Sequence, residues 1–378
     1  MSIDSAAKEV LRRLAGEGRL RQLPAEADGS LIDLCSNDYL GLAARANEFI
    51  PLLEGLRGRD MSASASRLLA ARQSETAALE SYLAELYGRP ALLFNSGYHA
   101  NTGVIAALAA IPGTLIIADR MSHASTIDGL VLSRTKFERF PHNDLARLRA
   151  LIEKYAPEYP NIVVAVESIY SMDGDRAPLR ELVALKSEFP GMAILLDEAH
   201  GFGCCGLRGL GLAEELGLIS QVDIIMCTLG KAAASAGAFV VASPVITDYL
   251  LNTSRSFIFS TALPPICARW SEIMIRRIVE MQSEREHLQR LAARLAEGLR
   301  SIGLPAQTVP SHIQPVVAGS AEAAMRLAGW LRSYGIMSLP IRRPTVPAGT
   351  ERVRLSLSAA LSESDIDKVI NALKYYKV

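Results

Sequence analysis

The sequence predicts an α/β fold with a mostly parallel central sheet and a smaller C-terminal α+β domain. Short apolar runs recur between stretches of helical periodicity, and these runs do not alternate with polar residues. Strands of this kind are buried on both faces, which is typical of parallel sheets covered by helices. The helical pattern also changes after Pro264-Pro265. The six predicted strands are Ala91–Asn95, Leu115–Ala118, Ile162–Val166, Ala193–Asp197, Asp223–Cys227 and Ala238–Ala242.

The clearest predicted helix follows Ser74, which we expect to cap its N-terminus. Gly88 stands where a left-handed residue commonly ends a helix. The N-terminal residues 1–8 also predict a capped helix, and they lack the apolar segment of a signal peptide. The helix after Ser74 has an apolar stripe formed by Leu79, Tyr82, Leu83 and Leu86.

The C-terminal part begins with a long amphipathic stretch over residues 266–302. The elements expected after it are a strand at Gln314–Val317, a helix at Ala321–Tyr334, strands near Met337–Ile341 and Arg352–Ser358, and a last helix from Ser362. We therefore predict three segments. Residues 1–45 form an N-terminal helix and short strand, 46–264 form the large α/β domain, and 265–378 form the smaller α+β domain.

Composition excludes several classes of protein. The 378 residues contain 40 Lys and Arg against 40 Asp and Glu, without a basic block, so we expect no nucleic-acid partner. No apolar run reaches the roughly 18 residues that span a bilayer, so we expect no membrane insertion and a cytoplasmic protein. The five cysteines are odd in number and form no C-x-x-C pair, which argues against a zinc site, another metal site or a disulfide framework.

Two chemically useful residues follow consecutive predicted strands. Asp197 closes one strand and Lys231 comes shortly after the next, and ligands of parallel sheets bind beyond the carboxyl ends of the strands. Small residues surround Lys231, and such a setting can desolvate an amine as a Schiff-base lysine requires. Gly201–Gly206 matches G-x-G-x-x-G, but no helix follows it directly, so we reject a dinucleotide site.

Two further segments are expected at the same sheet edge. Ser96–Asn101 follows a strand and begins a helix, and backbone N–H groups at a helix N-terminus bind phosphate. His123 follows the next strand and offers a flat ring. An amine, an acid, a flat ring and a phosphate site together predict pyridoxal phosphate (PLP) as cofactor.

Longer motifs strengthen this prediction, and with them the chain resembles the α-oxoamine synthases, PLP-dependent transferases with the fold of aspartate aminotransferase (fold type I). The resemblance extends from about Arg21 to the C-terminus. The motifs that carry it are Ser36–Gly41, Ser171–Gly174, Asp197–Gly203, Thr228–Lys231, Phe259–Pro265, Pro344–Thr350 and Arg352–Leu357.

The resemblance implies a role for each matching residue. Lys231 would form the imine with the cofactor, Asp197 would pair with the pyridine nitrogen, His200 would contact the phenolic oxygen, and His123 would stack on the ring. The phosphate would be held by Gly97, Tyr98, Thr228 and, from a second subunit, Ser260 and Thr261. Ser171 would also touch the cofactor. Substrate contacts would come from Arg21, His123, Thr345 and Arg354, with Arg354 binding the amino-acid carboxylate. Catalysis would rest on Lys231, His123, Asp197 and His200.

Within this family, Phe259–Pro265 and Pro344–Thr350 resemble the branch that acts in biotin biosynthesis. That branch condenses L-alanine with a pimeloyl thioester, carried by coenzyme A or acyl carrier protein, and yields 8-amino-7-oxononanoate, CO₂ and free thiol. The resemblance also implies a homodimer. One departure is the Ser/Ala stretch 62–66, which replaces the family's usual glycines, because Ser and Ala reach positive φ at a higher cost.

Three alternatives stay open at this point. A glycine-using member, of the glycine C-acetyltransferase or 5-aminolevulinate synthase type, would share every cofactor residue. An aminotransferase on the same fold is a second alternative. A non-catalytic homologue that binds a partner is the third, although such proteins typically lose the lysine that is present here at position 231.

Overall fold

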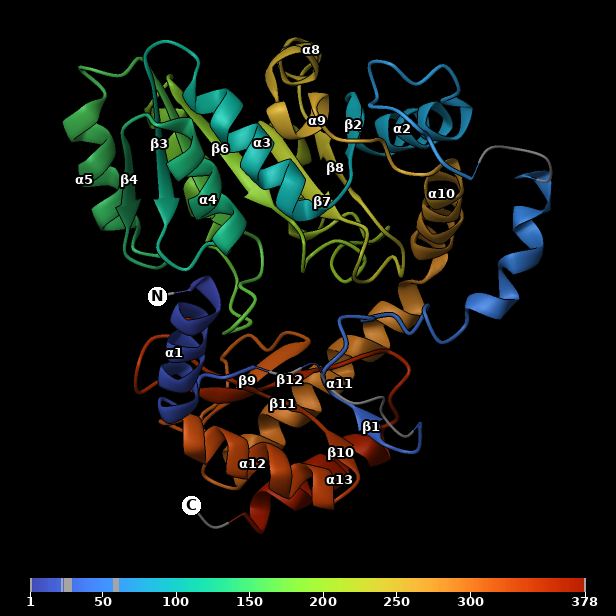
Figure 1. Cartoon of the computed structure of the whole chain (residues 1–378), viewed down its shortest axis with the longest axis vertical. Helices are drawn as coiled ribbons and strands as arrows, with labels where there is room; N and C mark the ends of the chain where they lie inside the picture. The colour runs from blue at the N-terminus through green and yellow to red at the C-terminus, as the bar shows by residue number, and fades with distance from the viewer. Residues whose placement is uncertain (1, 22, 24–28, 57–60, 377–378) are drawn as a thin grey trace. The chain divides into compact units, whose positions relative to one another are not determined.

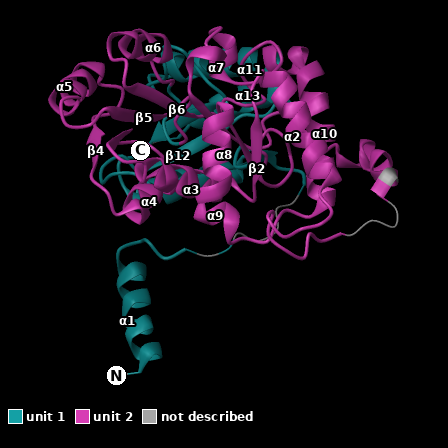
Figure 2. Cartoon of the chain, turned by 90° about the horizontal axis from the view of Figure 1, so that it is seen from above, with its two compact units in different colours: residues 1–37, 172–175, 287–378 teal, residues 38–171, 176–286 magenta. Residues whose placement is uncertain are grey.

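The computed structural model describes residues 2–21, 23, 29–56 and 61–376. They form two compact units (Figure 2). Unit 1 contains residues 1–37, 172–175 and 287–378, and unit 2 contains residues 38–171 and 176–286.

Unit 2 is built on a seven-stranded sheet with the order β2-β8-β7-β6-β5-β3-β4 (Figure 1). Only β8 runs antiparallel to its neighbours, which confirms the mostly parallel sheet. The strands are β2 (Ala91–Phe94), β3 (Thr114–Asp119), β4 (Phe137–Phe140), β5 (Asn161–Glu167), β6 (Met192–Asp197), β7 (Ile224–Thr228) and β8 (Ala238–Val241).

Helices cover both faces of this sheet. Figure 2 shows α5, α6 and α7 on one side of the strands and α3, α4 and α8 on the other. All residues of β2, β3 and β8 are buried, and polar side chains occur only at the ends of these strands. The helices of unit 2 are α2 (Ser74–Tyr87), α3 (Gly97–Ala109), α4 (Ala124–Ser133), α5 (Leu145–Tyr155), α6 (Leu179–Glu188), α7 (Leu212–Glu215), α8 (Pro244–Thr253), α9 (Arg255–Ile258) and α10 (Pro265–Glu280), with 3₁₀ turns at Ala46–Glu48, Ile50–Leu56 and Ile219–Gln221.

Strand β4 is absent from the predicted strands because the sequence of this edge strand is not an apolar run. Its two middle residues, Glu138 and Arg139, are charged, and only the last residue, Phe140, is buried. Glu138 accepts a hydrogen bond from the Tyr155 hydroxyl, and Arg139 donates one to the Arg120 carbonyl at 2.5 Å. An edge strand needs burial on one face only, so polar residues are tolerated there.

The predicted cap of α2 was wrong by one position. Gln73 is the N-cap residue and makes no side-chain cap bond, whereas Ser74 is already helical and its hydroxyl donates to Glu75 at 2.6 Å. The C-terminal prediction is confirmed, since Gly88 has φ of 69°. Residues 201–211 form turns, so no helix begins at the G-x-G-x-x-G match.

Unit 1 contains a three-stranded antiparallel sheet, β11-β12-β9, and a two-stranded parallel pair, β1-β10. Ser2 caps α1, and Ser362 forms a capping box with Asp365 at the start of α13. The elements are α1 (Ile3–Gly16), β1 (Ile32–Asp33), β9 (Ile313–Val317), α12 (Ala321–Ser333), β10 (Ile336–Met337), β11 (Leu339–Ile341), β12 (Arg352–Ser356) and α13 (Glu363–Lys374). Helix α11 (Gln282–Ser301) passes from unit 2 into unit 1 at residue 287.

The boundaries of the two compact units differ from those of the three predicted segments. The division into three domains stays a prediction. The main difference is α10, which packs against α2 within unit 2 rather than with the C-terminal elements. The predicted amphipathic stretch over residues 266–302 is two helices, which meet at Met281.

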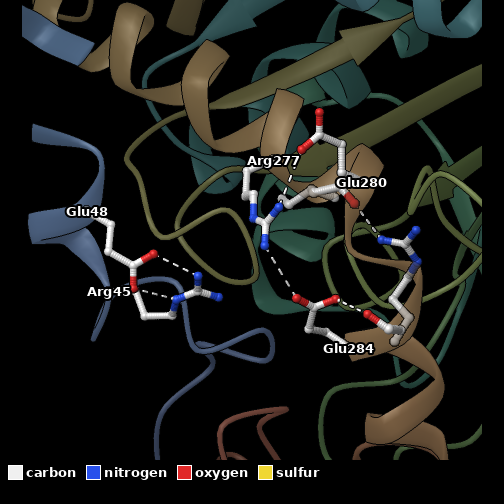
Figure 3. A network of polar contacts seen from close by, with 8 residues as sticks. Arg45, Glu48, Arg277, Glu280 and Glu284 are labelled. Atoms are coloured by element: carbon white, nitrogen blue, oxygen red, sulfur yellow. Dashed lines mark hydrogen bonds and ion pairs between the residues drawn. The ribbon is translucent and has the colours of Figure 1, made fainter. Parts of the chain in front are cut away.

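Charged side chains surround this helix junction on unit 2 (Figure 3). Arg45 and Glu48 pair at 2.7 Å, while Arg277 lies 3.4 Å from Glu280 and 3.6 Å from Glu284. Exposed ion pairs contribute about 0–1 kcal/mol each, so the network adds little to the stability of unit 2. Among the described helices, none is long and apolar enough to cross a bilayer.

Gly174 is expected to be essential for packing of segment 172–175 in unit 1. Its φ is +69°, and a Cβ there would overlap the carbonyl oxygen of Ile313 at the start of β9. The φ of Gly303 is similar, at +80°, but a Cβ there would meet nothing within 4 Å. Left-handed strain costs both Ala variants about 1–2 kcal/mol, and overlap should cost Gly174→Ala about 1–3 kcal/mol more. Urea unfolding of the two variants measures the difference. Equal losses would show that Gly174 supplies only its backbone conformation.

Candidate active site

A pocket with about 460 Å³ of empty volume lies in unit 2, where β5, β6 and β7 end. Seven residues predicted from the sequence meet in its wall: Gly97, Tyr98, His123, Asp197, His200, Thr228 and Lys231. The other lining residues are Asn101, Ser125, Glu167, Ala199 and Met226.

Lys231 lies in the turn between β7 and β8 and is partly buried. Its Nζ is 2.7 Å from His200 Nε2. The other ring nitrogen of His200, Nδ1, is 2.6 Å from the hydroxyl of the buried Tyr39. The amine at the pocket therefore belongs to a hydrogen-bonded chain that ends in the core of unit 2.

Asp197 is the last residue of β6 and is almost completely buried. Its Oδ1 accepts a hydrogen bond from the Ala199 backbone N–H at 2.8 Å, and its Oδ2 accepts one from Asn101 Nδ2 at 2.8 Å. Each carboxylate oxygen thus has a protein donor that fixes the plane of the group.

His123 is the N-cap residue of α4, and its Nδ1 faces the first turn of that helix. The Ser125 backbone N–H donates to Nδ1 at 3.2 Å, and Ser125 Oγ is 2.7 Å away from the same nitrogen. Burial lowers the pKa of His123, against an opposing effect of the Asp197 charge. The neutral form of the imidazole is therefore favoured.

Helix α3 points its N-terminus at the pocket. Ser96 caps this helix by accepting a hydrogen bond from the His99 N–H at 3.2 Å, and Gly97 and Tyr98 begin it at the pocket wall. A Cβ on Gly97 would lie 3.5 Å from the Thr228 side chain at the end of β7. The free N–H groups of the first turn and a hydroxyl therefore meet in one place, and this combination suits a phosphate.

Glu167 is a site residue that the sequence analysis missed. It ends β5 directly beside Asp197, its register partner on β6. Its Oε1 is buried without a hydrogen-bond partner. Burial, and then the charge of Asp197, raises the pKa of Glu167 to about 8. The same signal that identified Asp197, an acid closing an apolar run, could have found it.

Several predicted residues do not line the pocket. Arg21 and Thr345 lie in unit 1, where the guanidinium donates to the Thr345 hydroxyl at 3.0 Å. Arg354 is also in unit 1 and donates to Asn37 Oδ1 at 2.7 Å. Ser171, Ser260 and Thr261 belong to unit 2 but not to the pocket wall.

The segment that replaces the family's glycines pairs with residues that follow α9. Ser66 forms an isolated antiparallel bridge with Thr261, and the Ala262 N–H donates to the Ala65 carbonyl at 2.9 Å. Ser64 adopts φ of 56° despite its side chain, so serine does reach the left-handed region here. Its N–H donates to Ser62 Oγ at 3.1 Å, a local bond that offsets part of the cost.

The comparisons with known proteins place the chain in a family. Residues 30–373 match the model of aminotransferase class I and II. An 8-amino-7-oxononanoate synthase of Chlorobaculum parvum is 44% identical, over 97% of this chain and 95% of that protein. A serine palmitoyltransferase from S. paucimobilis, solved with a bound PLP–myriocin aldimine, superposes with a TM-score of 0.90 and 28% identity, covering 99% of this chain and 98% of the other. An 8-amino-7-oxononanoate synthase from Francisella tularensis gives 0.78 and 26%, covering 92% and 98%.

The chain belongs to the aminotransferase class I and II family, the fold type I transferases that use PLP. Within that family it is a PLP-dependent acyltransferase, and the resemblance to the α-oxoamine synthases is confirmed. The pocket fits this cofactor, because it offers an amine, a buried carboxylate, an imidazole face and a helix N-terminus around one cavity. Among the described residues, no three His, Cys, Asp or Glu side chains are grouped so that they could hold a metal ion.

Glu167 should make the cofactor-free protein lose stability as the pH rises. Its pKa is about 8 in the folded protein, against 4.5 for an ordinary Glu, so between these values the folded state holds a proton that the unfolded state has lost. The free energy of unfolding then falls with pH, by up to about 1.4 kcal/mol per unit from this group. Glu167→Gln cannot titrate and should show a flatter profile from pH 5 to 8 in urea unfolding. Glu181→Gln, at an exposed position of α6, is the control. Parallel profiles for parent and Glu167→Gln would contradict the raised pKa.

Proposed function

We propose that the protein condenses L-alanine with a pimeloyl thioester and releases CO₂ and free thiol to give 8-amino-7-oxononanoate, a step of biotin biosynthesis. The observation that carries the proposal is the pocket that joins Lys231, Asp197 and His123 beside a phosphate-binding helix end. The identity of 44% to a named 8-amino-7-oxononanoate synthase over nearly the whole length supports this choice of substrates. We expect a cytoplasmic enzyme that accepts the acyl group from coenzyme A or acyl carrier protein.

Lys231 would provide the amine that binds the cofactor and then moves a proton at the α-carbon of the amino acid. Bound PLP supplies an electron sink for the negative charge that develops at that carbon. His200, 2.7 Å from Nζ, would orient the amine and contact the phenolic oxygen of the cofactor. Tyr39 would in turn fix the ring of His200 from the core.

Asp197 would bind the protonated pyridine nitrogen. A buried carboxylate beside this nitrogen favours its protonated form and so stabilises charge withdrawn from the α-carbon. His123, which is neutral, would stack on the ring and contact the substrate. Gly97, Tyr98 and Thr228 would hold the phosphate, and Ser171 would contact the cofactor.

A homodimer would complete the site, with Ser260 and Thr261 of one subunit contributing to the phosphate site of the other. Arg354 would take the carboxylate of the amino acid through its planar guanidinium, which suits two parallel hydrogen bonds. Thr345 and Arg21 would be further substrate contacts, and their mutual hydrogen bond of 3.0 Å would keep them together in unit 1.

The structural match to serine palmitoyltransferase favours a second candidate, a synthase of the same class with a different amino acid and acyl group. Its TM-score of 0.90 exceeds the 0.78 of the 8-amino-7-oxononanoate synthase structure. Sequence identity favours the first candidate, with 44% against 28%. The glycine-using α-oxoamine synthases have the same cofactor chemistry, and the same experiment tests this alternative.

A panel of substrates should separate these candidates. L-alanine, glycine and L-serine are each combined with pimeloyl, acetyl and palmitoyl thioesters of coenzyme A, and with pimeloyl acyl carrier protein. Thiol release and the amino ketone are measured. We expect L-alanine with a pimeloyl donor to exceed every other amino acid and acyl chain by at least about tenfold in kcat/KM, or about 1.4 kcal/mol. Lys231→Ala should be inactive with all of them. A preference for glycine or serine would refute the proposed substrate, and transfer of the amino group without thiol release would indicate an aminotransferase.

Replacing the charge of Asp197 should separate cofactor binding from turnover. Asn has nearly the same shape but no charge, so Asp197→Asn should keep PLP, measured by its visible absorbance, while kcat falls roughly 10²–10⁴-fold, about 3–5 kcal/mol. Asp248→Asn, at an exposed position of α8, is the matched control. If Asp197→Asn stayed within about threefold of the parent, Asp197 would be only a structural acid at a strand end.

A further inference from the structure

We propose that Asn101 is a positioning residue that couples the carboxylate of Asp197 to the tautomer of His123. The inference concerns four side chains of unit 2, those of Asp197, Asn101, Ser125 and His123, and its functional meaning rests on the proposed roles of Asp197 and His123. Asn101 lies in the second turn of α3 and is 2% exposed. Asparagine is a poor residue for a helix interior, and a buried amide needs partners, so its presence there calls for a specific set of hydrogen bonds.

The contacts of Asn101 account for both of its amide hydrogens. Nδ2 donates to Asp197 Oδ2 at 2.8 Å and to Ser125 Oγ at 3.0 Å. Ser125 is completely buried, and its Oγ lies 2.7 Å from His123 Nδ1. A continuous chain of hydrogen bonds thus runs from the acid at the end of β6 to the ring that caps α4.

Two donors of Ser125 face His123 Nδ1, and this arrangement favours one direction for the bonds of the chain. The Ser125 backbone N–H donates to His123 Nδ1 at 3.2 Å, so this nitrogen is an acceptor and carries no hydrogen. Ser125 Oγ accepts from Asn101, and its own hydrogen is then available for His123 Nδ1. The neutral ring must therefore hold its proton on Nε2, the nitrogen on the opposite edge.

The electrostatic surroundings agree with this assignment. The titratable groups around His123 include Asp197, Lys231, Asp128 and Glu167. Burial is the largest effect and lowers the pKa of the ring, against the opposing charges of Asp197 and Asp128, so the neutral form is favoured. A neutral ring with Nε2–H offers a flat face and one donor to the pocket, while Asn101 holds the Asp197 carboxylate in place without adding charge. An aspartate at position 101 could not do this, because it would place an acceptor against Asp197 Oδ2.

The test measures the tautomer of His123 by ¹⁵N NMR of the cofactor-free protein with labelled histidine, assigned with His123→Gln. In the parent, we expect Nδ1 to be unprotonated and Nε2 protonated. Asn101→Leu keeps the volume and removes both donors, and Ser125→Ala removes only the hydroxyl link. Both should raise the fraction of the Nδ1–H form roughly two- to tenfold, since one hydrogen bond no longer favours the Nε2–H form. Thr102→Val, at a buried position of α3 whose hydroxyl bonds within its own helix, is the matched control and should change nothing.

A second measurement distinguishes positioning from mere stability. In the holoenzyme, Asn101→Leu affects both Asp197 and His123, so kcat should fall about tenfold with an unchanged PLP content, and more than in Ser125→Ala. An Nδ1–H fraction in both variants equal to that of Thr102→Val would overturn the inference. Because this readout uses the cofactor-free protein, it stands even if the proposed substrates are wrong. Should Asn101→Leu fail to fold, Ser125→Ala still decides the tautomer.

Discussion

The parallel register of β5, β6 and β7 is the constraint on which the site depends. Glu167 pairs with Asp197 and Asp197 with Met226, so β5 and β6 end at one level, and β7 continues two residues further to Thr228. Because their apolar residues are buried on both faces, polar side chains can occur only where the strands stop. Asp197 and Glu167 therefore reach the same cavity as Lys231, which the following turn supplies. A shift of one residue in register would turn each of these side chains to the other face of the sheet.

The carboxyl groups of Glu167 and Asp197 repel each other at this edge of the sheet, and the hydrogen bond from Asn101 of α3 to Asp197 offsets part of this repulsion. Two carboxyl groups end neighbouring strands, and burial together with the charge of Asp197 raises the pKa of Glu167 to about 8, although Lys231 lines the same pocket. Asp197 receives a donor on each oxygen, from Ala199 and Asn101, whereas Glu167 has a buried oxygen without a partner. The two acids are chemically alike, but one has a protein donor on each oxygen and the other has a raised pKa.

A site residue could be predicted from the sequence where one short segment shows both its chemical type and its place at a strand end or helix start. Asp197 and Lys231 stand at recognisable strand ends, and Gly97 and Tyr98 begin a helix after a strand. No role was predicted for Asn101 and Ser125, because the sequence does not reveal the hydrogen-bond partners of a polar residue inside a helix. Tyr39 supports His200 from 161 residues away, a contact that no local pattern reveals. The edge strand β4 was missed for a related reason, since its two consecutive charged residues resemble a surface loop.

The sequence by itself determined the α/β class, the mostly parallel sheet, the cofactor and the motifs of the family, because these depend on periodicity and on residues close together in the chain. Only the tertiary structure decided which acid has a donor on each oxygen, which donors face Nδ1 of His123, and that α10 packs with the large unit. It also showed that Ser64 adopts a left-handed conformation. Each of these properties depends on burial and on hydrogen bonds between distant segments, and these exist only once the strands and helices have packed together.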